Sequence, residues 1–536
     1  MLELGLLQLQ RRVDRLLAPW TEGRTPGCTI GVVREGALVL HRHAGLANLE
    51  LEVPIGPETT FRVASVTKQF TCTAILLLAE AARLSLADEI HSHLPDLPDF
   101  GAPITIDHLM HNTSGLRDFL ELMRLGGADL EAPCGTAEVL EVLGRQRGLN
   151  FPPGSRFLYS NTNFLLLGLI IEKLSGETLA AFTERRIFGP LGMTRSRMVA
   201  STKEIVPGLA GGYFPKPDGG FIKAGHGFPL GGEGALVSSV ADLALWDRNF
   251  TTGQVGGRAL TEALTTEAPL NNGEANAYAR GLAIGRYRGL GTVSHGGLWP
   301  GYRTEFLRLP ERKLSVIVIA NLGSIVPYSL ARAVVDAALE NERVLHPLVP
   351  LSERDTLQRL AGRYVDREAP ATLEITLGRD GAPSVICNGV PFTLIGDAED
   401  RLVADASSFA LSIRTTPDGL AVERVPGQSR LFRRAPEAAS LPPDLVGRYA
   451  CDEIGSVWTI SADGNGGMRA CADGPLVRGP HWEITPIAED IVRVWTPNPL
   501  YRSWFDVRVE RGPGGPVLGL RVNGGRTLGH FFARRE

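Results

Sequence analysis

The sequence predicts an α+β domain, in which helices flank a β-sheet, followed by two smaller modules built from β-strands. Strand-like segments occur at residues 28–46 and 314–323, near the two ends of the first 345 residues, and helical segments lie between them. Beyond this point the chain changes to short β-like runs separated by Gly, Asp and Pro. These later runs also repeat along the chain, which indicates two related modules.

The elements of the first domain follow from hydrophobic periodicity. Residues 28–46 (CTIGVVREGALVLHRHAGL) alternate as a hairpin does, with REG as its turn. Helical spacing marks residues 65–84 and 161–175, and a buried strand at 314–323 (LSVIVIANLG) precedes a helix at 329–340. We therefore expect one sheet with helices packed against it.

Proline-containing segments mark the boundaries of the β modules. LHPLVPLS follows the first domain and PEAASLPPD separates the modules, which gives domains at 1–345, 346–436 and 437–536. LAGRYVD at 360–366 matches LVGRYAC at 445–451, and SRLFRRAP near the end of the first module resembles GHFFARRE at the C-terminus. Because both ends of each module match, we expect two similar β-barrels or sandwiches.

Composition excludes several classes of function. The net charge is -4 and no long run of Lys or Arg occurs, so we expect no nucleic-acid partner. No uninterrupted apolar stretch reaches the roughly 18 residues that cross a membrane. The N-terminal 20 residues have apolar side chains at helical spacing, which predicts an amphipathic docking helix and not a secretion signal. The six scattered cysteines, with no CxxC pair, favour reduced thiols in a cytoplasmic protein.

Ser65 and Lys68 form the first candidate catalytic pair, at the start of the predicted helix 65–84. Their i, i+3 spacing places both side chains on one helix face, about 5–6 Å apart at Cβ. Serine needs a base to become a nucleophile, and lysine can act as that base when burial lowers its pKa, which the following AILLLA favours. The pair fits a nucleophile and its base, with Ser65 as a simple helix cap as the alternative.

Two further segments carry residue types suited to the same chemistry. Tyr159 and Asn161 (YSN) stand at a turn before the predicted helix 161–175. A tyrosine there is either a packing anchor or a phenol that transfers protons beside an ammonium. His295 and Gly297 (HGG) lie on a predicted strand, where glycines allow a substrate backbone to approach the strand edge. A purely structural histidine is the alternative.

In this order and at these spacings, SVTK, YSN and HGG resemble the motifs of the serine β-lactamase and penicillin-recognising peptidase superfamily, in its class C and S12 peptidase branch. Together with the two trailing modules, VTKQFTC and SGLRDF are similar to the bacterial D-aminopeptidases. The resemblance covers essentially the whole chain. It implies a catalytic domain of the β-lactamase/transpeptidase type, with an antiparallel sheet flanked by helices, and two C-terminal antiparallel β-barrel modules.

The resemblance also implies a mechanism through an acyl-enzyme. Ser65 would attack the substrate carbonyl, and Lys68 and Tyr159 would share the proton transfers. Water would then release the acyl group. No cofactor and no metal ion is expected, and the chain has no HExxH motif.

Four other residues are expected to bind substrate. By the resemblance, Asn161 would hold the substrate amide and the lysine, and His295 would assist the tyrosine or the substrate. The backbone N–H groups of Ser65 and Leu298 would form the oxyanion hole, beside Gly297. Such a donor typically contributes about 10²–10³ in rate, so this contribution is large.

The expected function is the release of N-terminal D-amino acids from short peptides, amides or esters, by a homodimer that β-lactams could inhibit. In D-aminopeptidases, a loop of the last barrel recognises the substrate ammonium with an acidic residue. The corresponding segment 496–504 (TPNPLYRSW) is short and contains Arg502 but no acid, which leaves the need for a free amine open. We expect this loop to limit substrate size, with Tyr501 and Trp504 as an apolar lid, and the alternative is an ordinary hairpin turn far from the site.

Two alternatives remain. The first is an esterase, a β-lactamase-like hydrolase or a D,D-peptidase on the same scaffold. The second is a penicillin-sensing or interaction protein without turnover. The complete set of Ser65, Lys68, Tyr159 and Asn161 argues against the second, because a binding protein has no need of all four.

Overall fold

The fold is taken from a computed structural model. It describes residues 2–227, 231–342, 344–346, 354–366, 368, 371–378, 381–387, 390–396, 401–404, 411–423, 429–436, 439–474, 481–496 and 503–536. The contacts divide the chain into two compact units. The first comprises Met1–Leu94, Ile104–Asn112 and Asn163–Pro347, and the second comprises Pro95–Pro103, Thr113–Thr162 and Leu348–Glu536.

The first unit contains a six-stranded sheet in the order β10-β11-β12-β13-β1-β2. Its strands are β1 (Cys28–Arg34), β2 (Ala37–Ala44), β10 (Ala283–Tyr287), β11 (Leu290–Trp299), β12 (Tyr302–Leu309) and β13 (Leu314–Ala320). Every neighbouring pair is antiparallel, and β1 from the start of the unit pairs with β13 from its end, with Cys28 opposite Ala320. The sheet of an α+β domain is confirmed, as are its hairpin and its late strand.

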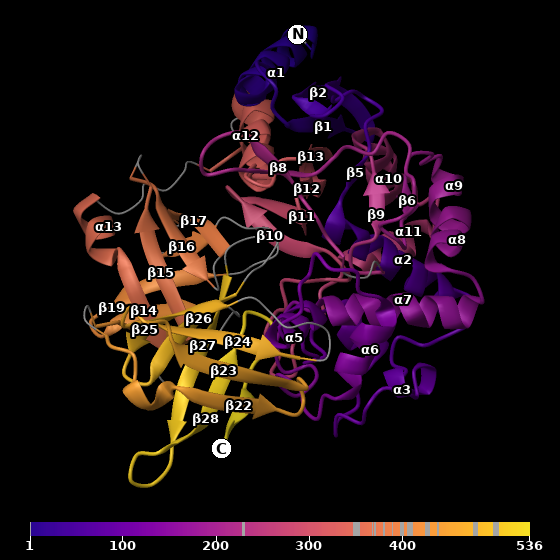
Figure 1. The fold of residues 1–536 in the computed structure, drawn as a ribbon. Helices are drawn as coiled ribbons and strands as arrows, with labels where there is room; N and C mark the ends of the chain where they lie inside the picture. The colour runs from indigo at the N-terminus through magenta and orange to yellow at the C-terminus, as the bar shows by residue number, and fades with distance from the viewer. Residues whose placement is uncertain are drawn as a thin grey trace. The chain divides into compact units, whose positions relative to one another are not determined.

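Helices cover both faces of this sheet (Figure 1). Helices α1 (Leu2–Leu17) and α12 (Pro327–Leu339) share one apolar core with alternate residues of β13, such as Val316 and Val318. The intervening residues of β13 point to the other face, where Ser315 hydrogen-bonds to α10 (Val240–Thr252).

The N-terminal helix docks as the sequence predicts. On α1, Leu9, Val13 and Leu17 are buried, whereas Leu6 and Leu7 are exposed. Within the described ranges, no helix combines the length and the apolar character that a membrane crossing requires.

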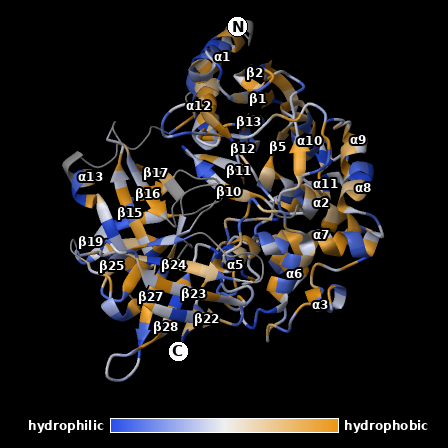
Figure 2. Ribbon diagram, in the orientation of Figure 1, coloured by the Kyte–Doolittle hydropathy of each residue, from blue (hydrophilic) through white to orange (hydrophobic). Residues whose placement is uncertain are grey.

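Two apolar helices carry the predicted motifs. Helix α2 (Thr67–Glu80) follows a 3-10 turn, Ala64–Val66, and is buried over most of its length. Helix α7 (Asn161–Ser175) begins at the predicted residue, and Figure 2 shows hydrophobic residues along most of it. The other helices are α3 (Ile90–His93), α4 (Ile106–Met110), α5 (Phe119–Leu125), α6 (Thr136–Gly144), α8 (Leu179–Thr183), α9 (Gly189–Leu191), α11 (Gly257–Thr265) and α13 (Arg354–Leu360).

The second unit contains two closed antiparallel barrels of eight strands each, so the modules are barrels and not sandwiches. The first consists of β14 (Gly362–Asp366), β15 (Ala371–Leu377), β16 (Pro383–Cys387), β17 (Val390–Gly396), β18 (Leu402–Ala404), β19 (Ser412–Thr416), β20 (Gly419–Glu423) and β21 (Ser429–Arg434). The second consists of β22 (Gly447–Cys451), β23 (Ser456–Ala462), β24 (Met468–Asp473), β25 (Trp482–Ala488), β26 (Ile491–Thr496), β27 (Ser503–Arg511), β28 (Val517–Asn523) and β29 (His530–Arg535).

A buried polar cluster joins the two barrels. Arg493 of β26 donates to the Thr372 hydroxyl (2.8 Å) and to the Glu374 carboxylate (3.0 Å), both on β15. Asp506 of β27 accepts the backbone N–H of Thr372 at 2.8 Å. Because Thr372, Arg493 and Asp506 are almost fully buried, their hydrogen bonds to one another help to fix how the barrels pack.

Candidate active site

Ser65 lies on a strained turn that presents it at the start of α2. The preceding residue, Ala64, has φ 50°, a left-handed conformation that a side chain disfavours. The turn is held because the Val63 N–H donates to Leu236 and the Thr67 hydroxyl donates to Ala64. Strained backbone of this kind persists where its surroundings impose it, often at functional sites.

Lys68 is fully buried one helical turn later, with its ammonium against Ser65. Its Nζ lies 3.0 Å from Ser65 Oγ and 2.7 Å from the carbonyl oxygen of Glu233. The Phe164 ring centroid lies 5.1 Å from the same nitrogen. The pair is therefore within reach for proton transfer, as a nucleophile and its base require.

The glycine-rich segment GGEG (231–234) supplies the carbonyl groups that hold this end of α2. The Thr71 hydroxyl donates to Gly232 O at 2.7 Å, next to the Glu233 carbonyl that accepts from Lys68. A Cβ on Gly232 would lie 2.4 Å from Phe164 O, so only glycine fits. The segment thus fixes the lysine through its backbone.

Strand β11 closely approaches the Ser65 turn. A Cβ on Gly297 would lie 2.2 Å from the carbonyl oxygen of Val63, two residues before Ser65. The absence of a side chain at Gly297 therefore lets the strand contact this turn. Leu298, the expected oxyanion donor, follows directly and pairs with Arg303 of β12.

His295 is a buried, neutral imidazole in this unit. The pKa of His295 is lowered to about 3, mainly by burial and secondly by the positive charge of Lys68. Its Nδ1 donates to Gly296 O at 2.6 Å, which leaves Nε2 to accept from the Tyr278 hydroxyl at 2.9 Å. Tyr278 was not predicted from the sequence.

The turn that carries Tyr278 packs on the backbone of Lys68. Gly281 has φ 74°, and a Cβ added at this position would lie 2.7 Å from the Lys68 carbonyl group. Nothing in the run AYARG distinguishes it from an ordinary loop, so its role depends on contacts between distant parts of the chain.

Tyr159 and Asn161 belong to the second unit, where Asp118 orients the asparagine. The Asp118 carboxylate accepts the backbone N–H of Asn161 (2.7 Å) and its side-chain amide (2.9 Å). It also caps α5, because it accepts the N–H groups of Leu120 and Glu121. The amide nitrogen of Asn161 thus faces Asp118, and its oxygen is turned away.

Residues of the second barrel lie beside the same segment. The Arg526 guanidinium carbon lies 4.6 Å from the centroid of the Tyr159 ring, which is almost fully buried. Asp118 and Arg526 were not singled out from the sequence. Asp118 lies in SGLRDF, but this motif does not indicate which residue the aspartate contacts. Arg526 lies in the loop NGGRTLG, which resembles any hairpin connection.

The predicted substrate loop is only partly within the described residues. Tyr501 and Arg502 lie outside them, as do the other residues from 497 to 502. Trp504 is described, and the prediction that it forms a lid is wrong. It is buried in β27, donates to Asp506 at 3.0 Å and stacks with Arg493.

The first unit contains five of the predicted site residues. They lie at the start of α2 and on β11: Ser65, Lys68, His295, Gly297 and Leu298. Tyr159 and Asn161 lie together before α7 in the second unit. The fold and the Ser–Lys pair define a serine hydrolase of the β-lactamase fold.

Comparison with known proteins agrees. The beta-lactamase family model matches residues 9–339. A D-aminopeptidase of Gluconobacter oxydans is 32% identical over 506 residues, which covers 93% of each chain. A D-aminopeptidase of Brucella anthropi is 26% identical, also over 93% of each chain. The chain therefore belongs to the beta-lactamase family, in the group that includes these D-aminopeptidases.

Solved structures share the fold. A penicillin-binding protein homologue from Pyrococcus abyssi matches with a TM-score of 0.56 and 24% identity, over 79% of this chain and 99% of its own. A D-amino acid amidase from Ochrobactrum anthropi matches with a TM-score of 0.53 and 23% identity, over 63% of this chain and 99% of its own. At these identities the likeness concerns the fold alone.

Proposed function

We propose that the protein releases N-terminal D-amino acids from short peptides, amides or esters through an acyl-enzyme on Ser65. The observation that carries the proposal is the buried Lys68 side chain, whose Nζ lies 3.0 Å from Ser65 Oγ. The similarity to D-aminopeptidases over 93% of the chain, barrels included, supports the substrate class.

In the proposed mechanism, neutral Lys68 takes the Ser65 proton as Oγ attacks the substrate carbonyl. Lys68 and Tyr159 then pass a proton to the leaving amine. Water attacks the ester, the same groups accept its proton and pass it to Ser65 Oγ as the C–Oγ bond breaks, and the D-amino acid leaves. Every step is general acid–base or nucleophilic catalysis by side chains.

The remaining residues bind and orient. The backbone N–H groups of Ser65 and Leu298 are proposed to stabilise the oxyanion, which typically contributes about 10²–10³ per donor. Asn161 is proposed to hold the substrate amide, and its anchoring by Asp118 supports this role. A neutral His295, hydrogen-bonded by Tyr278, is proposed to assist as a polar partner and not as a cation.

Ester hydrolysis is the second candidate function. The segment 496–504 contains no acid that would bind a substrate ammonium, so an ester or a β-lactam without a free amine is the competing substrate. The homodimer, inhibition by β-lactams and a cytoplasmic location belong to the same proposal. They rest on the family resemblance and on the scattered cysteines.

A colorimetric panel tests the proposal. It compares the p-nitroanilides of D-Ala and L-Ala, a nitrophenyl ester and a chromogenic cephalosporin, with Ser65→Ala as the inactive control. We expect turnover of the D-anilide well above the L-anilide, and a fluorophosphonate adduct on the peptide that contains Ser65. Turnover of the ester or the cephalosporin alone would favour the second candidate, and an adduct on another serine would refute the assignment of the nucleophile.

A further inference from the structure

The connection between β28 and β29 of the second barrel reaches the segment that carries Tyr159. Within this connection, Arg526 places its guanidinium carbon 4.6 Å from the centroid of the Tyr159 ring. Its Nη1 lies 3.8 Å from Asp118 Oδ2, the oxygen that holds Asn161. One cation of the barrel therefore contacts Tyr159 directly and Asn161 through Asp118.

The backbone of this connection is fixed on both sides. The Glu121 carboxylate accepts the N–H groups of Gly525 (3.1 Å) and Arg526 (2.7 Å). The Arg526 carbonyl accepts from the Asp118 N–H (3.3 Å) and from the Asn150 amide (3.1 Å). Four hydrogen bonds thus hold the base of the Arg526 side chain, so its placement over the ring costs little entropy.

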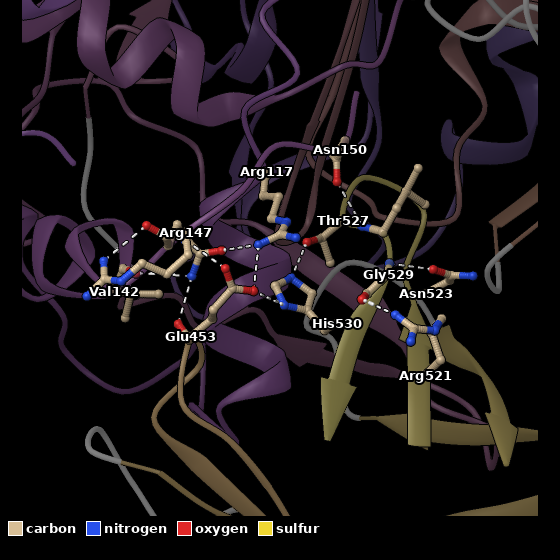
Figure 3. A network of polar contacts seen from close by, with 12 residues as sticks. Arg117, Val142, Arg147, Asn150, Glu453, Arg521, Asn523, Thr527, Gly529 and His530 are labelled. Carbon is tan, nitrogen blue, oxygen red and sulfur yellow. Dashed lines mark hydrogen bonds and ion pairs between the residues drawn. The ribbon is translucent and has the colours of Figure 1, made fainter. Parts of the chain in front are cut away.

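A second network anchors the end of the connection (Figure 3). Asn150 accepts the N–H of Leu528 at 2.8 Å, and Thr527 hydrogen-bonds to His530 at 2.9 Å. Arg117 pairs with Glu453 at 2.9 Å, which ties the segment before α5 to the same barrel. The Arg526 turn is therefore anchored by hydrogen bonds on both sides, and its side chain remains 37% exposed.

We propose that Arg526 is a positioning residue for Tyr159, supplied by the second barrel. The inference rests on the proposed function of Tyr159 in proton transfer. The planar guanidinium holds the aromatic ring by a cation–π contact. The same positive charge favours the phenolate over the phenol, and so readies Tyr159 to accept a proton.

Other charged groups face this cation. The Asp118 carboxylate lies 3.8 Å from the guanidinium, and four N–H donors already engage it. Glu121 accepts the two N–H groups of the turn, and its pKa is raised, first by burial and next by the charge of Asp118. Arg124 adds a further positive charge on α5. Arg526 is the cation whose guanidinium lies over the Tyr159 ring.

The test compares Arg526→Met, which removes the charge and keeps an unbranched side chain, with Arg526→Lys, which keeps the charge. Arg521→Met is a matched control, because Arg521 lies on β28 above the Phe531 ring at 5.3 Å and its side chain is 38% exposed, against 37% for Arg526. The readout is the pH dependence of kcat/KM on a nitrophenyl ester and of Ser65 acylation by a fluorophosphonate. Thermal unfolding checks that each variant is folded.

We expect Arg526→Met to move the acid limb of both pH profiles to higher pH by about one unit. Below that limb, kcat/KM and the rate of Ser65 acylation should fall approximately tenfold. Arg526→Lys should restore most of the lost rate, and Arg521→Met should change neither profile. In a Tyr159→Phe background, Arg526→Met should cause no further shift. An unchanged profile in Arg526→Met, an equal shift in the control, or an undiminished shift without the phenol would overturn the inference.

The outcomes separate this inference from the proposed function. If the wild-type protein acylates Ser65 but does not hydrolyse a D-anilide, the substrate class fails and the Arg526 comparison still stands. If the D-anilide is hydrolysed and the Arg526 variants keep the wild-type profile, the inference alone fails. Absence of acylation at Ser65 in the wild-type protein would overturn both.

Discussion

Acid should destabilise the second unit through His530, a fully buried histidine of β29. Burial lowers the pKa of His530 to about 4, although the Glu453 carboxylate 3.6 Å away opposes this effect. Arg117, which pairs with Glu453 at 2.9 Å, adds a repulsive charge. At neutral pH the imidazole is therefore uncharged, and it hydrogen-bonds to Thr527 at 2.9 Å.

The sign and the size of the effect follow from linkage. An unfolded histidine takes up a proton near pH 6.5, whereas folded His530 does so near pH 4, so the unfolded state binds more protons between these values. The free energy of unfolding then falls with decreasing pH, at up to about 1.4 kcal/mol per pH unit. Between pH 6.5 and pH 5 the loss due to this residue is about 2 kcal/mol.

Glu453 acts at lower pH. Burial alone would raise the pKa of its carboxylate, but the His530 contact, the charge of Arg117 and the N–H of Arg147 lower it to about 2. Below about pH 4 His530 is itself protonated, so in the range where Glu453 titrates its contact adds to the charge of Arg117 and to the Arg147 N–H, which lies 2.7 Å away. Its stabilising contribution is lost only as the pH falls from about 4.5 to 2.

The assay is hydrogen exchange of peptides around β29 in the full-length protein, combined with urea unfolding at pH 7, 6 and 5. His530→Gln cannot gain a proton, so its stability should change by about 2 kcal/mol less than that of the wild type over this range. His481→Gln, an exposed histidine of the same barrel, is the control and should follow the wild type. Parallel curves for His530→Gln and the wild type would refute the reasoning.

Three further predictions concern the site. Asp118→Asn places an amide against the donors of Asn161, and kcat/KM should fall roughly 10- to 100-fold, whereas an unchanged value would remove Asp118 from the site. Gly297→Ala would place a Cβ 2.2 Å from the Val63 carbonyl oxygen in the Ser65 turn; we expect kcat/KM to fall about 10²-fold, while Gly285→Ala on β10 should have a mild effect. Lys68→Arg keeps the charge but cannot take a proton near pH 7, so in single-turnover acylation it should be as slow as Lys68→Ala, and retained activity would indicate a purely electrostatic role.

The parts of the fold that the sequence predicts are those that local patterns encode. The hairpin at 28–46 and the strand at 314–323 show the alternation and the apolar run of a sheet, and α7 begins at the residue that the turn before it indicates. The internal repeat predicts two similar β modules because each barrel begins and ends with the same strand pattern. Whether these strands form sandwiches or closed barrels depends on the pairing of the first strand with the last, which no local pattern records.

The site is predictable to the same limit. Ser65 and Lys68 are three residues apart, so their contact follows from helix geometry. Tyr278 lies 17 residues before its partner His295, and Arg526 lies several hundred residues after Tyr159. Such contacts arise only when distant segments fold together, and a single chain carries no local signal for them.

The second barrel contacts the segment that carries Tyr159 and Asn161. Residues 113–162, with Tyr159 and Asn161, pack with the barrels into one compact unit and are not grouped with the sheet that carries Ser65. Their polar anchors come from the second barrel: Glu453 holds Arg117, and the Arg526 carbonyl accepts the Asp118 N–H. Trp458 of β23 donates to the carbonyl of Leu125 at the end of α5, so both ends of that helix depend on the barrel. Removal of the second barrel would leave these buried groups of α5 and its neighbours without partners, at about 1–3 kcal/mol each. The barrel is therefore part of the support of the YSN segment, and its loss should disorder that segment even if the sheet remains folded.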